Sequence, residues 1–266
     1  MKMSQNFFSD IPSGRIAYTK RGDGPKLVLL HPIGIDRTWW DPYVLVWQKN
    51  YQVLTIDLRG HGDSSRVREP ITLSAHATDV AGVLDQEGIE AATIIGVSMG
   101  GMVAQRLAIE APNKVKAMIL CATAGSFPDH IRESIRSRGN VSRDGEMSEV
   151  VEESLARWFL PDSPRPDLLE RCRADLLKGD WFSWSANWEA IAAMDNLEKL
   201  QTTQAPALVI TGGADIAAPP AISRQLANAI PKAKLVIVPA ASHFGAFETP
   251  SAFLPAFDTF LEQAGR

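Results

Sequence analysis

Short runs of apolar residues alternate along most of the chain with segments of helical periodicity. The apolar runs are rich in β-branched residues and predict strands at residues 26–31, 51–57, 92–97, 115–122, 207–211 and 235–238. Helical periodicity falls between them, at about residues 73–87, 99–112, 220–230 and 250–263. Near-continuous apolar strands separated by helices are typical of a parallel sheet with helices on both faces. Residues 15–20 predict one further strand at the edge of this sheet.

The alternation stops between residues 124 and 205. This stretch has helical spacing and more charge, and no part of it resembles a strand. It also holds four of the seven tryptophans, Trp158, Trp181, Trp184 and Trp188. We interpret residues 124–205 as a helical lid inserted in a core formed by residues 1–123 and 206–266. The lid is expected over the carboxyl ends of the strands, because ligands bind at that edge of open α/β sheets.

Composition narrows the class of protein. The 266 residues are 45% hydrophobic and 22% charged, which is ordinary for a globular enzyme of one domain. The net charge of -4 and the lack of a Lys/Arg-rich run argue against a nucleic-acid partner. No apolar stretch reaches the roughly 18 residues of a transmembrane helix, and residues 1–12 lack the apolar core of a signal peptide. We therefore expect a cytoplasmic protein without a membrane partner, and both a monomer and a homo-oligomer fit the sequence.

The cysteines carry no sign of a metal site. Cys121 and Cys172 are not in a C-x-x-C spacing, and Cys121 lies in an apolar run that predicts a buried core thiol. Neither a bound metal nor a disulfide is expected.

A short motif brings the first candidate chemistry. Residues 96–100 read G-V-S-M-G and lie between a predicted strand and a predicted helix, which is the context that G-x-S-x-G requires. Gly96 and Gly100 lack a Cβ, so the strand and the helix can approach closely around a sharp turn. Ser98 then projects beside the helix N-terminus, where Met99 offers a free N–H to a developing oxyanion. Ser98 is the predicted nucleophile.

A serine nucleophile needs a base and an acid that orients the base. In this motif's fold the chain order is serine, acid, histidine, and only His130 and His243 follow Ser98. His130 opens the lid without a core strand before it, whereas His243 follows a strand and a short loop. Asp215 is the first carboxylate after the strand at 207–211, and the loop after strand 115–122 has none. Asp215 and His243 therefore complete the predicted triad.

The loop after the strand at 26–31 is the second expected source of an oxyanion donor. Pro32 has no N–H, so Ile33 is the candidate, and Gly34 lets the loop fold toward the nucleophile. His31 is interpreted as a residue that holds this loop by hydrogen bonds.

Residues 57–64 read D-L-R-G-H-G-D-S and are interpreted as a structural turn. We expect Asp57, Arg59 and Asp63 to form a local hydrogen-bonded network. No histidine set accompanies the two aspartates as metal ligands would require.

Aromatic residues are candidates for an apolar substrate pocket. Trp39 and Trp40 follow the oxyanion loop, and the four lid tryptophans lie farther along the chain. Each of them has core packing as the alternative role. Arg157 is compatible with a contact to a substrate carboxylate and equally with a salt bridge inside the lid.

Five segments carry a resemblance to a known family. They are HPIG at 31–34, DLRGHGDS at 57–64, GVSMGG at 96–101, GGADIAAPP at 212–220 and ASHFGAFETP at 241–250. Over nearly its whole length the chain resembles the α/β-hydrolase superfamily, and within it the 3-oxoadipate enol-lactonase group. The stretches at 157–159, 186–195 and 206–220 carry the closer likeness. The resemblance implies Ser98, Asp215 and His243 as the triad, and hydrolysis of a small lactone or ester without a cofactor.

The lid departs from that group at two positions. The group usually carries a Trp and an Arg near the start of the lid, and Ile131 and Ser134 occupy those places here. Ile131 is therefore a further candidate for substrate contact.

Other reactions remain open for the same triad: hydrolysis of a C–C bond, or perhydrolysis. The lack of a Gly-Pro-Gly stretch after His31 argues against the C–C hydrolases. A ligand receptor with little turnover is the alternative outside the enzymes.

Overall fold

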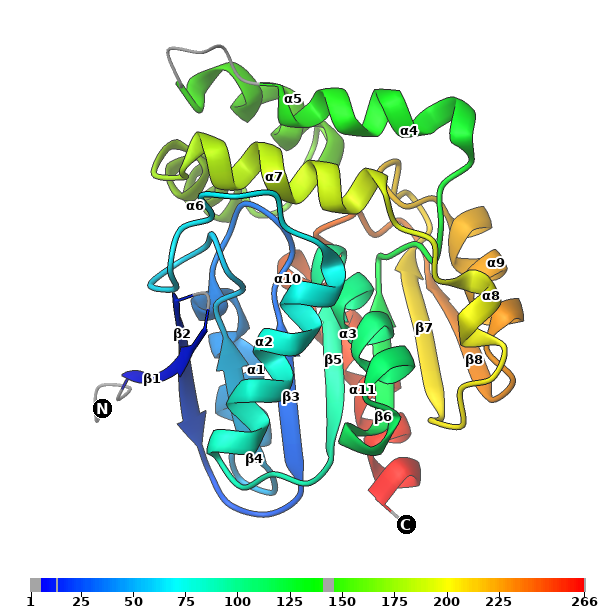
Figure 1. The fold of residues 1–266 in the computed structure, drawn as a ribbon. Coiled ribbons are helices and arrows are strands. Elements are labelled where there is room, and N and C mark those ends of the chain that lie inside the picture. Colours follow the sequence, from blue (N-terminus) through cyan, green and yellow to red (C-terminus); the bar gives the residue numbers. More distant parts are fainter. Residues whose placement is uncertain (1–5, 13, 141–145, 266) are drawn as a thin grey trace.

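A computed structural model describes residues 6–12, 14–140 and 146–265 and has one sheet of eight strands (Figure 1). The strands are β1 (Asn6–Ile11), β2 (Gly14–Arg21), β3 (Lys26–Leu30), β4 (Gln52–Ile56), β5 (Ala92–Val97), β6 (Val115–Cys121), β7 (Ala207–Gly212) and β8 (Ala233–Val238). Their order across the sheet is β1-β2-β4-β3-β5-β6-β7-β8. From β4 to β8 every neighbouring pair is parallel, so their carboxyl ends share one edge.

The prediction of an edge strand at residues 15–20 is wrong in its position. This strand is β2, which lies between β1 and β4 and pairs with both in the antiparallel sense. The strand at this edge of the sheet is β1. Its six residues, NFFSDI, form neither a continuous apolar run nor a regular alternation, so the sequence did not predict a strand there. Of the N-terminal segment discussed above, residues 1–5 lie outside the described part of the chain.

Helices cover both faces of the sheet. The core helices are α1 (Asp41–Trp47), α2 (Leu73–Gln86), α3 (Met99–Glu110), α9 (Pro220–Ala229), α10 (Gly245–Glu248) and α11 (Pro250–Gly265). In Figure 1, α2 and α3 lie in front of the sheet, and α1 and α11 lie behind it. The four long helices predicted from the sequence are present, whereas α1 was not predicted. The strands between these layers are almost entirely buried, as their continuous apolar runs require.

The lid contains the helices α4 (Asp129–Arg136), α5 (Ser148–Trp158), α6 (Pro166–Leu177), α7 (Trp181–Ala192) and α8 (Leu197–Leu200). Helices α4 to α7 lie across the carboxyl ends of the parallel strands (Figure 1). The lid begins and ends at neighbouring points, because Ser126 pairs with Asp195 in a β-bridge and Asn196 N–H donates to the Gly125 carbonyl at 2.8 Å. In the described part of the chain, no helix has the length and apolarity needed to cross a membrane.

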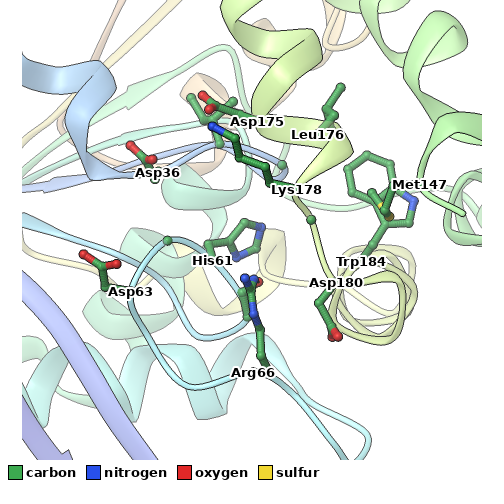
Figure 2. Close-up of a pocket in the computed structure, with 15 residues that line it drawn as sticks. Asp36, His61, Asp63, Arg66, Met147, Asp175, Leu176, Lys178, Asp180 and Trp184 are labelled. Carbon is green, nitrogen blue, oxygen red and sulfur yellow. The ribbon is translucent and has the colours of Figure 1, made fainter. Parts of the chain in front are cut away.

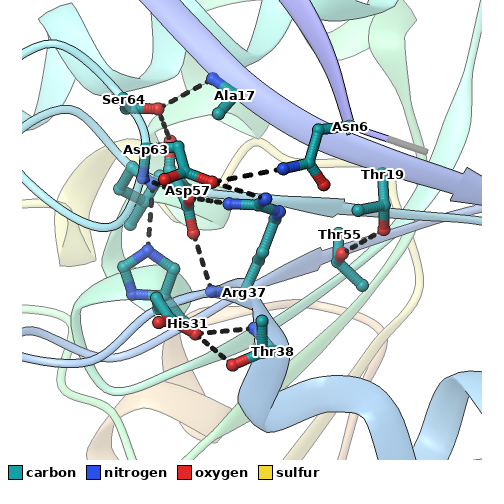
Figure 3. Close-up of polar contacts among 12 residues, drawn as sticks. Asn6, Ala17, Thr19, His31, Arg37, Thr38, Thr55, Asp57, Asp63 and Ser64 are labelled. Carbon is teal, nitrogen blue, oxygen red and sulfur yellow. Dashed lines mark hydrogen bonds and ion pairs between the residues drawn. The ribbon is translucent and has the colours of Figure 1, made fainter. Parts of the chain in front are cut away.

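A buried carboxylate organises the turn at residues 57–64 (Figure 3). Asp57 is fully buried and accepts the Arg37 backbone N–H at 2.8 Å, the Asp63 N–H at 2.8 Å and an ion pair from the Arg37 guanidinium. The same guanidinium reaches the half-exposed Asp63 at 2.8 Å. Burial raises the pKa of Asp57, while His31 and Arg37 act against that rise.

The predicted network needs one correction. Arg59 does not join Asp57 and Asp63 but pairs with Asp79 on α2. Its place is taken by Arg37, which is far from the turn in sequence. The turn is nevertheless a hydrogen-bonded structural unit, as expected.

The Arg37–Asp57 pair supports a stability prediction. Removal of one member of a buried pair leaves the other as an uncompensated charge, which costs about 3–5 kcal/mol. We expect Asp57→Ala to lower the free energy of unfolding by about this amount in urea titrations. Asp63→Ala removes the exposed partner and should cost less than about 1 kcal/mol. Equal losses in the two variants would contradict this ranking.

Candidate active site

Ser98 lies on a strained turn between β5 and α3. Its backbone angles are φ 52° and ψ -117°, in a region that residues with a Cβ rarely adopt. The turn is held by the Ser98 N–H, which donates to the Cys121 carbonyl at 2.9 Å. The Thr123 hydroxyl donates to the Ser98 carbonyl at 2.7 Å. These bonds leave the Ser98 hydroxyl free to face the site above the sheet.

The two glycines of the motif are required by close packing. A Cβ on Gly96 would lie 2.3 Å from Gly100 backbone atoms, and a Cβ on Gly100 would lie 2.2 Å from the Leu30 carbonyl oxygen. Helix α3 can therefore start directly against the ends of β3 and β5 only with glycine at these positions.

The structure brings the three predicted triad residues together. His243 Nε2 lies 3.0 Å from the Ser98 Oγ, and His243 Nδ1 lies 2.9 Å from the Asp215 Oδ2. The other oxygen of Asp215 accepts the N–H groups of Ala217 and Ala218, each at 2.8 Å. Burial raises the pKa of Asp215, but His243 and these two donors outweigh it, so the pKa lies below its ordinary value. The carboxylate is thus ionised and oriented toward the imidazole.

The loop after β3 contains Ile33, one of the two candidate oxyanion donors. Gly34 has φ 86°, and Ile33 before it is buried. His31 anchors the loop: its Nδ1 lies 2.7 Å from the Pro32 carbonyl, and its Nε2 accepts the Leu58 N–H at 2.9 Å. These contacts require a neutral ring, and burial lowers the pKa of His31 accordingly.

The second candidate donor, Met99, is the first residue of α3. Its N–H therefore has no acceptor within the helix and faces the N-terminal end, beside Ser98.

A small cavity lies against the triad. Its volume is about 30 Å³, and Ser98, His243, Met102, Arg138, Trp158 and Trp188 are among its lining residues. A space of this size holds about one or two water molecules. The space beside the Ser98 hydroxyl is therefore narrow, and Trp158 and Trp188 of the lid form part of its wall.

Only some of the residues predicted to contact the substrate line this cavity. Trp158 and Trp188 line it, whereas Trp184 lines a neighbouring pocket. Trp39 and Trp40 are buried in the core beneath the lid, and Trp39 donates its indole N–H to Asp175 at 2.8 Å.

Two further candidates also lie away from the cavity. Ile131 is half-buried and packs against the hydrophobic core. Arg157 pairs with Glu153, which is the lid salt bridge that the sequence left as an alternative.

Arg138 lines the cavity and was not predicted. Its guanidinium lies 5.4 Å from the centre of the Trp188 ring, and it forms no ion pair with any described residue. Burial, followed by the nearby Arg157 charge, lowers the pKa of Arg138 to about 10. A half-buried cation without a carboxylate partner is a candidate for binding an anionic group of a ligand. No pattern in the sequence distinguishes Arg138 from the other arginines of the lid, because its surroundings are defined only by the fold.

A second, larger pocket opens between lid and core (Figure 2). It has a volume of about 230 Å³ and is lined by Gly34 and His61 from the core and by Leu176 and Trp184 from the lid. The ring of Trp184 contacts that of Trp158, with centroids 6.3 Å apart. One ring of this pair therefore faces the outer pocket and the other faces the Ser98 cavity.

Fold and site together define a class of protein. A serine on a strained strand-to-helix turn, bonded to a histidine–aspartate pair above a mostly parallel sheet, is the arrangement of α/β hydrolases. The family model described as "Alpha/beta hydrolase family" matches residues 27–256, and the chain belongs to this family.

Among its relatives, 3-oxoadipate enol-lactonase 2 of Acinetobacter baylyi is 29% identical over 245 residues, which are 91% of either chain. A candidate non-heme bromoperoxidase of Mycobacterium tuberculosis is 28% identical over 261 residues, covering 92% of this chain and 97% of that one. The solved structure of the enol-lactonase from Burkholderia xenovorans LB400 matches with a TM-score of 0.89 at 30% identity. It covers 96% of this chain and 100% of that one. The likeness to enol-lactonases extends over the lid as well as the core.

The close packing around the strained turn at Ser98 leads to a prediction about stability. Gly100→Ala places a methyl group against the Leu30 carbonyl, so we expect a loss of about 3 kcal/mol or more in the free energy of unfolding. Gly82→Ala is the matched control on α2, where the nearest atom to a new Cβ is a side-chain methyl at 3.3 Å. Since alanine favours helices, this control should change stability by at most about 1 kcal/mol. Similar melting temperatures for the two variants would contradict the close packing at Ser98.

Proposed function

We propose that the protein is a serine hydrolase that cleaves a small carboxylic ester or lactone through an acyl-enzyme. The observation that carries this proposal is the hydrogen-bonded chain from Ser98 through His243 to Asp215, with 3.0 Å and 2.9 Å between its members. His243 Nε2 takes the Ser98 proton as the Oγ attacks the carbonyl carbon. His243 then gives this proton to the leaving oxygen, and the ester C–O bond breaks. With a lactone, the leaving oxygen stays on the acyl chain and the ring opens.

Two backbone N–H groups are the candidates for receiving the oxyanion. Ile33 lies in the loop after β3, and Met99 is the first residue of α3, whose Gly100 packs against the Leu30 and His31 carbonyl groups. Fixed donors of this kind contribute about 3–4 kcal/mol each to lowering the barrier. In the second half of the reaction His243 activates a water molecule that releases the acid. These steps need neither a metal nor a cofactor.

The cavity and the relatives support a proposal for the substrate class. Trp158 and Trp188 offer apolar walls, and Arg138 offers a positive charge that forms no ion pair with a described residue. The similarity to the enol-lactonases includes the lid, which covers the cavity. We infer a small acyl group with a carboxylate at its far end, held by Arg138 rather than by an arginine at position 134.

Ser98→Ala tests the reaction itself. We expect wild-type protein to hydrolyse p-nitrophenyl acetate with a burst and to be labelled once per chain by a fluorophosphonate. The Ser98→Ala variant should lose the label and at least about a thousandfold in kcat, because the nucleophile is gone. Wild-type turnover no greater than that of the variant would favour a ligand receptor. A panel of esters and lactones that includes an enol-lactone distinguishes the two substrate classes. Hydrolysis of linear esters alone would exclude lactonase activity.

Arg138→Met tests the anionic substrate. Monomethyl adipate and methyl hexanoate match in chain length and differ in the terminal carboxylate. We expect the variant to reduce kcat/KM for monomethyl adipate about tenfold or more, and to leave methyl hexanoate within about twofold, because only the charged end loses its partner. Arg157→Met is the control, since Arg157 already pairs with Glu153. An equal effect on both esters would show that Arg138 does not recognise charge.

A further inference from the structure

Glu248 is a buried carboxylate outside the triad. It ends the short helix α10, its residue is 7% exposed, and it forms no ion pair in the described part of the chain. Two hydroxyl groups donate to it instead: Ser163 to one carboxylate oxygen and Ser242 to the other. Burial of a carboxylate is unfavourable unless its oxygens are hydrogen-bonded, so the two serines stabilise Glu248 where it lies. The Arg165 charge also acts on Glu248 but forms no ion pair with it within the described residues.

The two serines come from different parts of the molecule. Ser163 lies in the lid, in the connection between α5 and α6, whereas Ser242 lies in the core immediately before His243. Glu248 therefore joins the lid to the loop that carries the candidate base. Ser163 is held in turn by its own N–H, which donates to the Leu160 carbonyl at 3.0 Å.

The residue on the other side of His243 is also bound to the lid. The Phe244 N–H donates to the Trp158 carbonyl at 3.1 Å, and the two rings stack with centroids 5.1 Å apart at an angle of 12°. Trp158 ends α5 and lines the cavity at Ser98. Both chain neighbours of His243 are thus tied to the same part of the lid, the end of α5 and its connection to α6, through a direct backbone bond and through Glu248.

We propose that Glu248 is a positioning residue that makes the alignment of His243 with Ser98 depend on the docking of the lid. The inference rests on the proposed function. In this proposal the lid moves to admit a substrate to the narrow cavity at Ser98, whose wall includes Trp158. When the end of α5 returns to its place, Ser163 and Trp158 draw Ser242 and Phe244 back, and the His243 Nε2 regains its hydrogen bond to Ser98. Proton transfer is then confined to the closed state.

Ser163→Ala is the first test, because it cuts the lid side of the contact and leaves the core loop intact. We expect the rate constant for fluorophosphonate labelling and kcat for a small ester to fall about tenfold, since small misplacements of a base reduce rates by such factors. KM should change by less than about twofold, and labelling should still reach one per chain, because every molecule stays folded. Arg68→Ala is the control: it removes an exposed lid–core ion pair with Asp180 that does not contact the His243 loop.

Variants at Glu248 test the link from both sides. Glu248→Gln keeps an acceptor for one serine and should retain most of the rate, whereas Glu248→Ala should resemble Ser163→Ala or fall below it. In the Glu248→Ala background, Ser163→Ala should have no further effect, because the contact is already lost. An additive effect of the two substitutions would overturn the proposal.

The remaining outcomes are distinct from failure of the proposed function. A wild-type protein that is neither labelled nor hydrolytic removes the function and this inference with it. A wild type that is labelled, with Ser163→Ala as fast as Arg68→Ala, removes only the positioning role. A Ser163→Ala variant whose labelled fraction falls together with its melting temperature shows a contact that serves stability alone, which also overturns the proposal.

Discussion

The close approach of backbone segments around Ser98 is the constraint on which the site depends. Helix α3 starts against the carboxyl ends of β3 and β5, at a distance that excludes a Cβ at Gly96 and Gly100. The strained turn costs about 1–3 kcal/mol, and it persists because the surrounding strands hold its amide and carbonyl. The parallel arrangement of the strands then brings the loops after β3, β7 and β8 to the same edge. A serine, an acid and a base from distant parts of the sequence can therefore meet there.

The turn at Ser98 and the triad could be predicted from the sequence, because the turn depends on a local pattern and the triad on the order of residues along the chain. A strand, a glycine-flanked serine and a helix lie next to one another in sequence, and only one acid and one histidine follow suitable strands. Features that depend on contacts between distant segments were harder to predict from the sequence. The edge strand β1 has its pairing with β2 as its main support, and Arg37 reaches Asp57 across the fold.

The residues that line the cavity also could not be identified from the sequence alone. Tryptophan is equally suited to a core and to a pocket, so sequence could not distinguish Trp39 in the core from Trp158 at the cavity. Arg138 was missed because what marks it is the lack of an acidic partner, which becomes visible only when its neighbours in space are known. Polar residues of the lid have to be judged by what surrounds them rather than by their type.

The joined ends of the lid have an evolutionary consequence. Because Ser126 pairs with Asp195, the two ends of the insertion leave the core side by side and the insertion forms a closed loop. The entropic penalty of closing such a loop rises only slowly with its length. Lineages can therefore lengthen, shorten or replace this insertion without disturbing the sheet, so one scaffold can acquire new substrates by exchanging the part of the chain that covers its nucleophile.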